Sequence, residues 1–312
     1  MLAVVERSGL DEAFHEGCVA VADPSGRLTA WFGDVDRHFF VRSAAKPFQA
    51  AVCLQSGVDL PPEHLAVACA SHDGTPVHVE IVRRILSDGG LDESDLGCPP
   101  ARPLSATADR EWAGRGSTER RRVFHDCSGK HALMLRACVA AGWDPAGYLD
   151  PGHPLQIRQL EGMRAVGALV DDTVGIDGCG APVFRVSGRT LAAAYARLSD
   201  PVFAPVWTAM HRYPALVSGS GNADTEIAVG LHAVAKRGAE GLLAVAVAGR
   251  GSLVVRCWDG SERAVAVAAL SALDQLGWIG ERTPLRQSLG RPVRGGGVPV
   301  GSVRPVFQLE HA

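Results

Sequence analysis

A serine and a lysine three residues apart stand out in the segment Arg42-Ser43-Ala44-Ala45-Lys46. The chain has 31 lysines and arginines, and only three of them are lysines, at positions 46, 130 and 236. Arginine stays charged in proteins, whereas a desolvated lysine can lose its proton and then act as a base or a metal ligand. Each lysine lies beside a motif of small residues, so this sparing use of lysine predicts an active site.

Ser43 and Lys46 have the types and spacing of a nucleophile and its base. A serine hydroxyl is a weak nucleophile until a neighbouring group takes its proton, and a lysine buried at a helix start can do so at neutral pH. Ser-x-x-Lys followed far downstream by Lys-x-Gly is the arrangement of serine β-lactamases and penicillin-binding proteins, and Lys236-Arg237-Gly238 fits the second element. In the alternative interpretation, Ser43 is a helix cap and Lys46 is a surface charge. The scarcity of lysine in the chain favours the catalytic interpretation.

Two of the eight cysteines, Cys127 and Cys179, lie in glycine-rich turns, and Lys130 follows Cys127 by one helical turn. Thiolates favour zinc, and a neutral lysine amine is an uncommon third ligand. The close Cys or His pairs typical of zinc sites are missing, so spacing alone equally indicates two free thiols near a pocket. Cysteines within apolar runs, such as Cys53, Cys69 and Cys138, are expected to be buried small hydrophobes.

Further polar residues beside these motifs have two interpretations each. Asp177 either holds the ammonium group of a substrate or accepts backbone N–H bonds within its own turn. Arg42 is either a clamp for a carboxylate or a solvated cation. His72 and His131 either line the site or are structural histidines, the commoner case.

The bulk properties favour a protein that binds a small molecule. The chain has 312 residues, of which 46% are hydrophobic and 21% charged, so we expect a single domain, in one or two lobes, with a substantial core. A net charge of −3 with scattered arginines predicts no nucleic-acid partner. Neither a signal peptide nor an apolar run of about 20 residues is evident, which predicts a cytoplasmic protein without a membrane anchor.

Hydrophobic periodicity predicts the elements that must position these residues. Strands are expected at 2–6, 16–22, 27–32, 39–41, 241–247 and 252–257. Helices are expected at 43–55, 76–86, 130–141, 154–169, 191–198, 201–211 and 263–276. Terminal strands around a mostly helical middle predict an α/β sandwich in which an antiparallel sheet has helices on both sides.

Other segments give weaker patterns. Residues 65–70 form a short apolar segment before Ser71, residues 91–122 form a surface excursion without clear periodicity, and residues 174–182 form a glycine-rich turn. The Gly/Pro-rich tail at 291–300 is expected to be ordered by docking or not at all.

Together these motifs resemble the asparaginase II family, the thermolabile, rhizobial-type L-asparaginases. The matching features run through most of the chain: Glu12–Gly17, Gly33-Asp34, Arg42–Gln49, Ala70-Ser71-His72, Cys127–His131, Gly175–Cys179 and Lys236–Gly241. The sequence departs from the family pattern at His125-Asp126, where Asn-rich residues are expected, at Asp73, in place of a small hydroxyl residue, and at Gly221-Asn222, in place of Gly-Arg.

The resemblance implies a serine β-lactamase or glutaminase-like fold, a homodimer and two Ser-Lys pairs. By position, it implies that Ser43 with Lys46 is the nucleophile pair and Ser71 with Lys236 the second pair. It further implies that Arg42 supports the site, that Asp177 binds the substrate, and that Cys127, Lys130 and Cys179 hold a modulatory zinc ion. Arg42 and His72 are also expected to contact the substrate.

The resulting prediction is an L-asparaginase that hydrolyses L-asparagine to L-aspartate and ammonia. Two alternatives stay open from the sequence. One is another amidohydrolase on the same scaffold, such as a glutaminase or a β-aspartyl peptide hydrolase. The other is a zinc-binding protein without catalytic activity.

Overall fold

An antiparallel six-stranded sheet forms the centre of the computed structural model, which describes residues 1–280, 284–285 and 291–312. Strands from both ends of the chain pair within this one sheet, as predicted. The strand order is β13 (Glu310–His311), β4 (Leu28–Phe32), β3 (Gly17–Ala22), β10 (Gly251–Cys257), β9 (Leu242–Val247) and β8 (Val234–Gly238). β8, which the sequence analysis missed, lies at the edge and carries Lys236.

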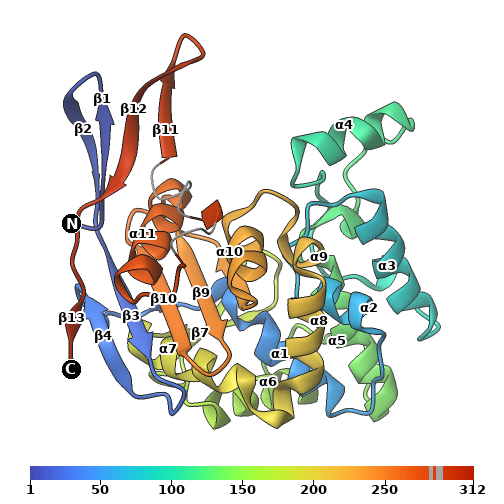
Figure 1. Cartoon of the computed structure of the whole chain (residues 1–312). Coiled ribbons are helices and arrows are strands. Elements are labelled where there is room, and N and C mark those ends of the chain that lie inside the picture. The colour runs from blue at the N-terminus through green and yellow to red at the C-terminus, as the bar shows by residue number, and fades with distance from the viewer. Residues whose placement is uncertain (281–283, 286–290) are drawn as a thin grey trace.

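Helices cover both faces of this sheet, which confirms the predicted sandwich (Figure 1). Since side chains alternate along a strand, Ala20 faces the core that contains helix α7 (Gly188–Ala196), whereas Val19 and Val21 face the core of helix α11 (Glu262–Gln275). All three side chains are almost fully buried. Burial of each valine contributes about 1.5–3 kcal/mol to the hydrophobic stabilisation of the fold.

The two ends of the chain meet in a second, four-stranded sheet. It contains β11 (Arg291–Gly295), β12 (Val298–Pro305), β1 (Ala3–Arg7) and β2 (Leu10–His15), in that order. The tail at 291–300 is therefore ordered by docking, since β12 pairs with β1 and β11 with β12. β2 was missed because its sequence, Leu-Asp-Glu-Ala-Phe-His, is polar and mostly exposed.

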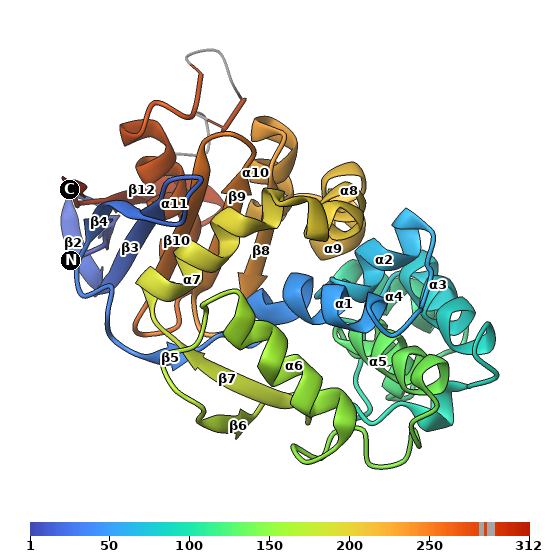
Figure 2. The same ribbon diagram turned by 90° about the horizontal axis from the view of Figure 1, so that it is seen from below.

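The middle of the chain is mostly helical and packs beside β8 (Figures 1 and 2). Its helices are α1 (Lys46–Leu54), α2 (Pro62–Ala68), α3 (Pro76–Ser87), α4 (Ala106–Gly114), α5 (Ser128–Ala141), α6 (Pro154–Ala165), α8 (Ala204–Arg212), α9 (Pro214–Ser218) and α10 (Ala223–Leu231). A small sheet of β5 (Phe39–Phe40), β7 (Pro182–Val186) and β6 (Val174–Ile176) lies below them in Figure 2.

Three predictions in this region need correction. Most of the apolar segment 65–70 lies in the C-terminal part of helix α2. This helix begins at Pro62, and proline is tolerated in the first turn of a helix. The excursion 91–122 contains α4, whose N-cap Ser105 accepts bonds from the N–H groups of Thr107 and Ala108. The turn at 174–182 includes strand β6 and the first residue of β7, so only its centre is a turn.

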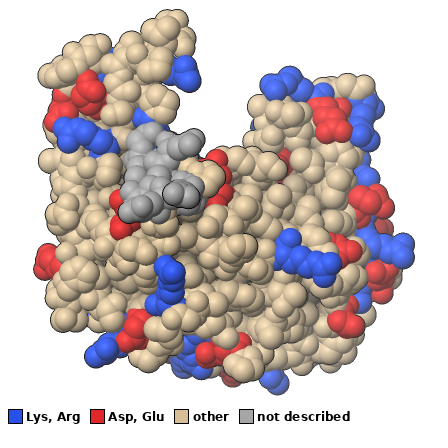
Figure 3. All heavy atoms as spheres, in the orientation of Figure 1, with Lys and Arg blue, Asp and Glu red and all other residues tan. Residues whose placement is uncertain are grey.

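The displayed surface carries charges of both signs, and its centre is largely uncharged (Figure 3). The surface is hollowed between the four-stranded sheet on one side and α4 on the other. Within the described residues, every helix is too short or too polar to cross a bilayer.

Candidate active site

Two buried lysines converge on one serine. The Nζ atoms of Lys46 and Lys236 each lie 3.0 Å from Oγ of Ser71 and can both donate to it. Lys46 also donates to the carbonyl of Ala70, and Lys236 donates to the carbonyl of Arg237 at 2.8 Å. Lys46 is 1% exposed and Lys236 fully buried, so this Lys-Ser-Lys centre is shielded from bulk water.

Each member of the centre comes from a different element. Lys46 is the first residue of α1, directly after a 3₁₀ turn at Arg42–Ala45, and Pro47 follows where a helix tolerates proline. Ser71 follows α2, and its N–H donates to the carbonyl of Val217. Lys236 lies in the middle of edge strand β8, which packs against the 3₁₀ turn. Because three distant segments build it, the centre exists only in the folded chain.

The start of α1 is anchored by an aromatic cluster. Phe48 packs edge-on against Tyr195 and Phe203, with ring centroids 5.5 and 5.8 Å apart. The hydroxyl of the buried Tyr195 donates to the carbonyl of Ala44 at 2.8 Å, which satisfies a polar group that the 3₁₀ turn leaves free. The position of Lys46 is therefore fixed by its own helix and by α7.

Burial gives one of the two amines an unusual acidity. Desolvation first, and the neighbouring charge of Lys46 second, lower the pKa of Lys236 to about 7. Two protonated amines sharing one oxygen repel each other, so a neutral amine is available near neutral pH. A neutral lysine next to a hydroxyl is a general base.

Ser43 lies beside this centre but does not join its hydrogen bonds. Its carbonyl accepts from the N–H of Lys46 as the 3₁₀ turn passes into α1, and the residue is 9% exposed. Among the described residues, none forms a hydrogen bond with its Oγ. The structure thus brings Lys46 to Ser71 and leaves the hydroxyl of Ser43 without a protein partner.

Arg42 is held from two sides next to Ser43. Its Nε lies 2.7 Å from Oδ1 of Asp177, and a guanidinium nitrogen lies 3.9 Å from a carboxylate oxygen of Glu240. Asp177 also accepts the N–H of Gly178 within its own turn. The backbone of Arg42 has a φ of +48°, which an L-residue adopts only when its surroundings hold it there. The carboxylate of Asp177 is therefore shared between a backbone N–H of its own turn and the guanidinium of Arg42.

His72 is fully buried and its ring is satisfied by the protein. Nε2 bonds to Oγ of Ser128 at 2.9 Å, and Nδ1 accepts the N–H of Gly74 at 3.1 Å. Ser128 in turn donates to the carbonyl of Val123. Desolvation holds the pKa of His72 well below its usual range, so the ring is neutral and links α5 to the segment that carries Ser71.

His131 is likewise buried. Its Nδ1 bonds to the hydroxyl of Tyr148 at 2.6 Å, and that oxygen also accepts the N–H of Gly97 at 2.8 Å. Desolvation lowers the pKa of the ring well below its usual range. This arrangement agrees with the structural interpretation of this histidine.

The two predicted thiols and the third lysine come together next to the centre. Nζ of Lys130 lies 3.1 Å from Sγ of Cys179, and Cys127 and Cys179 share a hydrogen bond. That bond and, after a partial offset by burial, the charge of Lys130 lower the pKa of Cys179 to about 5. Two sulfurs and an amine are donors that suit zinc, so the residues present fit the metal that the family resemblance implies.

The glycine of the Cys127-Ser128-Gly129-Lys130 motif permits close packing. A Cβ atom on Gly129 would lie 2.2 Å from the carbonyl oxygen of Val67. The start of α5 therefore touches the end of α2, the helix that leads to Ser71. This contact brings the thiol site and the Lys-Ser-Lys centre into one region.

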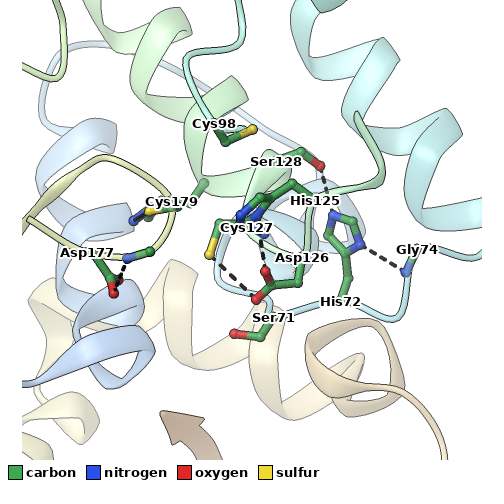
Figure 4. A network of polar contacts seen from close by, with 12 residues as sticks. Ser71, His72, Gly74, Cys98, His125, Asp126, Cys127, Ser128, Asp177 and Cys179 are labelled. Carbon is green, nitrogen blue, oxygen red and sulfur yellow. Dashed lines mark hydrogen bonds and ion pairs between the residues drawn. The ribbon is translucent and has the colours of Figure 1, made fainter. Parts of the chain in front are cut away.

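The sequence analysis noted His125 and Asp126 only as departures from the family pattern. Asp126 lies between the thiols and the centre, where Cys127 Sγ is 3.6 Å from its Oδ2 and Nδ1 of His125 is 3.0 Å from its Oδ1 (Figure 4). Burial acts to raise the pKa of Asp126, but the hydrogen bond from His125 and the charge of Lys46 outweigh burial and lower the pKa. The sequence signal that could have pointed to Asp126 was an acidic residue directly before Cys127.

A buried serine between two lysines, on an α/β sandwich with a thiol site beside it, defines a class of protein built for acid–base chemistry at a hydroxyl. The sequence matches the family described as L-asparaginase II over residues 3–305. This chain therefore belongs to the L-asparaginase II family, as the motifs predicted. No curated protein sequence matches it.

Solved structures that resemble this chain include Mglu in its tris and glutamate form, with 17% sequence identity and a TM-score of 0.41 over 90% of this chain. Mglu in its native form has 16% identity and a TM-score of 0.40 over 84% of this chain. In both comparisons the match covers 64% of the Mglu chain.

Proposed function

We propose that this protein is an amidohydrolase that cleaves the side-chain amide of L-asparagine to give L-aspartate and ammonia. The observation that carries the proposal is the contact of Ser71 with the buried amines of Lys46 and Lys236 in a member of the L-asparaginase II family. This contact supports proton transfer at a serine hydroxyl near neutral pH, which covalent amide hydrolysis requires.

In the proposed mechanism, Lys46 takes the proton of Ser43 and a proton passes through Ser71 to the neutral amine of Lys236, while Oγ of Ser43 forms a bond to the amide carbon. The C–N bond then breaks, and Ser71 passes a proton from Lys236 to the departing ammonia. The resulting acyl-enzyme is cleaved by water, which restores the serine and releases aspartate. Backbone N–H groups would hold the oxyanion.

Ser71 is the second candidate nucleophile. Its hydroxyl is the one that both lysine amines contact, whereas Ser43 has no such partner among the described residues. With Ser71 as nucleophile, Lys236 would accept its proton and Lys46 would stabilise the charge. The reaction catalysed is the same in both versions, and only the acylated residue differs.

Arg42 and Asp177 are proposed to bind the zwitterionic end of the amino acid. They present opposite charges 2.7 Å apart beside Ser43, and an ammonium and a carboxylate group could exchange with this ion pair. His72 is proposed to act on the substrate only through the segment that it holds, because its ring is buried and hydrogen-bonded.

Cys127, Lys130 and Cys179 are proposed to hold a zinc ion. A bound zinc would supply a positive charge and a fixed link between the motif at 127–130 and the turn at 177–180. No step of the mechanism above uses it. The protein is also proposed to be a homodimer in the cytoplasm, as the family resemblance implies.

The decisive experiment measures ammonia release by the purified protein from L-asparagine, L-glutamine and a β-aspartyl dipeptide. Release from asparagine at the highest kcat/KM supports the proposal, whereas preference for either other amide assigns the site to the corresponding alternative. Zinc content without ammonia release from any of the three would support the non-catalytic zinc-binding protein.

The nucleophile is assigned with the variants Ser43→Ala and Ser71→Ala. Rapid acid quenching followed by peptide mass spectrometry should find an aspartyl ester on Ser43 of the wild-type enzyme. An ester on Ser71 instead would support the second candidate nucleophile.

A further inference from the structure

The buried carboxylate of Asp224 lies next to the strand that carries Lys236. Asp224, in the first turn of α10, is 1% exposed. Its Oδ2 accepts the hydroxyl of Ser218 and, at 3.0 Å, the backbone N–H of Arg237. Its Oδ1 is buried without a hydrogen bond, and no ion pair joins it to a basic side chain of the described residues. An isolated buried charge is costly, so its retention calls for an electrostatic partner.

The contacts of Asp224 lead directly to the reactive amine. The residue that it holds through a backbone N–H is Arg237, whose carbonyl accepts from Nζ of Lys236 at 2.8 Å. That same Nζ lies 3.0 Å from Oγ of Ser71. Arg237 is thus bracketed by the carboxylate at its N–H and by the amine at its carbonyl, and its guanidinium holds Asn222 and the carbonyl of Ser218.

We propose that Asp224 is a positioning residue for the amide hydrolysis: it fixes the Arg237 backbone that holds Lys236 on Ser71, and it supplies the buried negative charge that balances the protonated Lys236. This inference rests on the proposed function for its kinetic test, but not for its stability test below.

Several other charges face Lys236 and set the size of the expected effect. Burial and the nearby Lys46 and Arg237 lower the pKa of Lys236, whereas Asp224 and Asp126 raise it. Among the described residues, Cys69 also interacts electrostatically with Lys236, and Asp73 and Tyr195 interact with Asp224. Of the two acids, Asp224 has the larger effect on the pKa of Lys236. Removing its charge should therefore lower the pKa of Lys236 further.

Asp224→Asn separates charge from shape. Asparagine can place its carbonyl oxygen where Oδ2 lies and keep both hydrogen bonds, while its amide occupies the position of the unbonded Oδ1. The wild-type kcat/KM should rise with pH through about 7, the pKa of Lys236. In Asp224→Asn this rise should move about one pH unit lower, with the value at pH 8.5 within about threefold of wild type.

Asp224→Ser, smaller and also uncharged, is the second variant and should shift the rise in the same direction. Glu262→Gln is the control, since this exposed carboxylate lines the same pocket as Asp224 and should leave the profile unchanged. A profile that stays in place in both Asp224 variants would overturn the inference, as would a fall in the plateau without a shift.

The second readout needs no substrate. Because the pKa of Lys236 is lower in the folded than in the unfolded chain, the unfolded chain takes up this proton first as pH falls, and stability is lost. Asp224→Asn should extend that loss to lower pH, so its melting-temperature gap to wild type should widen between pH 8 and pH 6. A constant gap would overturn the inference even if no amide were hydrolysed.

Discussion

Lys46 donates to Ser71 across a sequence separation of 25 residues, with 3.0 Å between Nζ and Oγ. Its nearer neighbour in sequence is Ser43, one turn earlier, which the spacing Ser-x-x-Lys had suggested as its partner. In the structure the amine therefore pairs with Ser71 and not with Ser43. This geometry allows Lys46 to share a proton with Lys236 through Ser71.

Replacement of Lys46 by arginine tests whether the amine must lose its proton. Lys46→Arg keeps a cation at the site but cannot act as a base, so ammonia release should fall by about 10²–10⁴-fold. Circular dichroism melting should show that the variant still folds cooperatively. A variant that retains near wild-type turnover would contradict a deprotonatable Lys46.

The acid side of the activity profile should report Lys236. Below its pKa of about 7 Lys236 carries a proton and cannot accept another, so kcat/KM should be about tenfold lower at pH 6 than at pH 8. Initial rates in buffers of constant ionic strength would measure this. A flat profile between these two values would remove Lys236 from the proton transfer.

Arg42 should be sensitive to backbone conformation as well as to charge. Arg42→Ala and Arg42→Gly both lose the ion pair to Asp177, but only alanine keeps the cost of a φ of +48°. Urea unfolding should therefore find the glycine variant more stable than the alanine variant by about 1 kcal/mol. Both should raise the KM for asparagine. Equal stability would show that the turn relaxes in the variants.

Zinc binding is checked with Cys179→Ala. Elemental analysis after dialysis should find about one zinc per wild-type chain and a loss of most of it in the variant, since two sulfurs supply the strongest donors. Cys138→Ala is the matched control, because this thiol is also buried but is not one of the three proposed ligands. Equal zinc content in all three proteins would place the metal elsewhere.

Gly129 should not tolerate a methyl group. Gly129→Ala would place Cβ 2.2 Å from the carbonyl oxygen of Val67, so α5 must move away from α2. We expect a loss of about 1–3 kcal/mol in the free energy of unfolding, measured in urea. Gly114→Ala on α4, which has open space around it, is the control and should be neutral or stabilising. Equal effects of the two substitutions would contradict the contact.

The sequence predicted the local elements better than the partners of the site residues. The helix that ends at residue 141 and the buried strand at 16–22 follow from local sequence patterns, and both are confirmed. The contact of Lys46 with Ser71 depends on how α1 packs against α2, which no local spacing encodes. β8 was missed because two cations interrupt its apolar pattern, one of them the buried Lys236.

The register of β8 decides which cation reaches Ser71. Lys236 pairs with Ala244 and Arg237 with Leu243 across the antiparallel ladder, so their side chains point to opposite faces. Slippage by a single residue would exchange an amine that can be neutral for a guanidinium that cannot. The hydrogen bonds of one edge strand thus determine which basic side chain lies at Ser71. A chain with this strand mispaired would be folded but inactive.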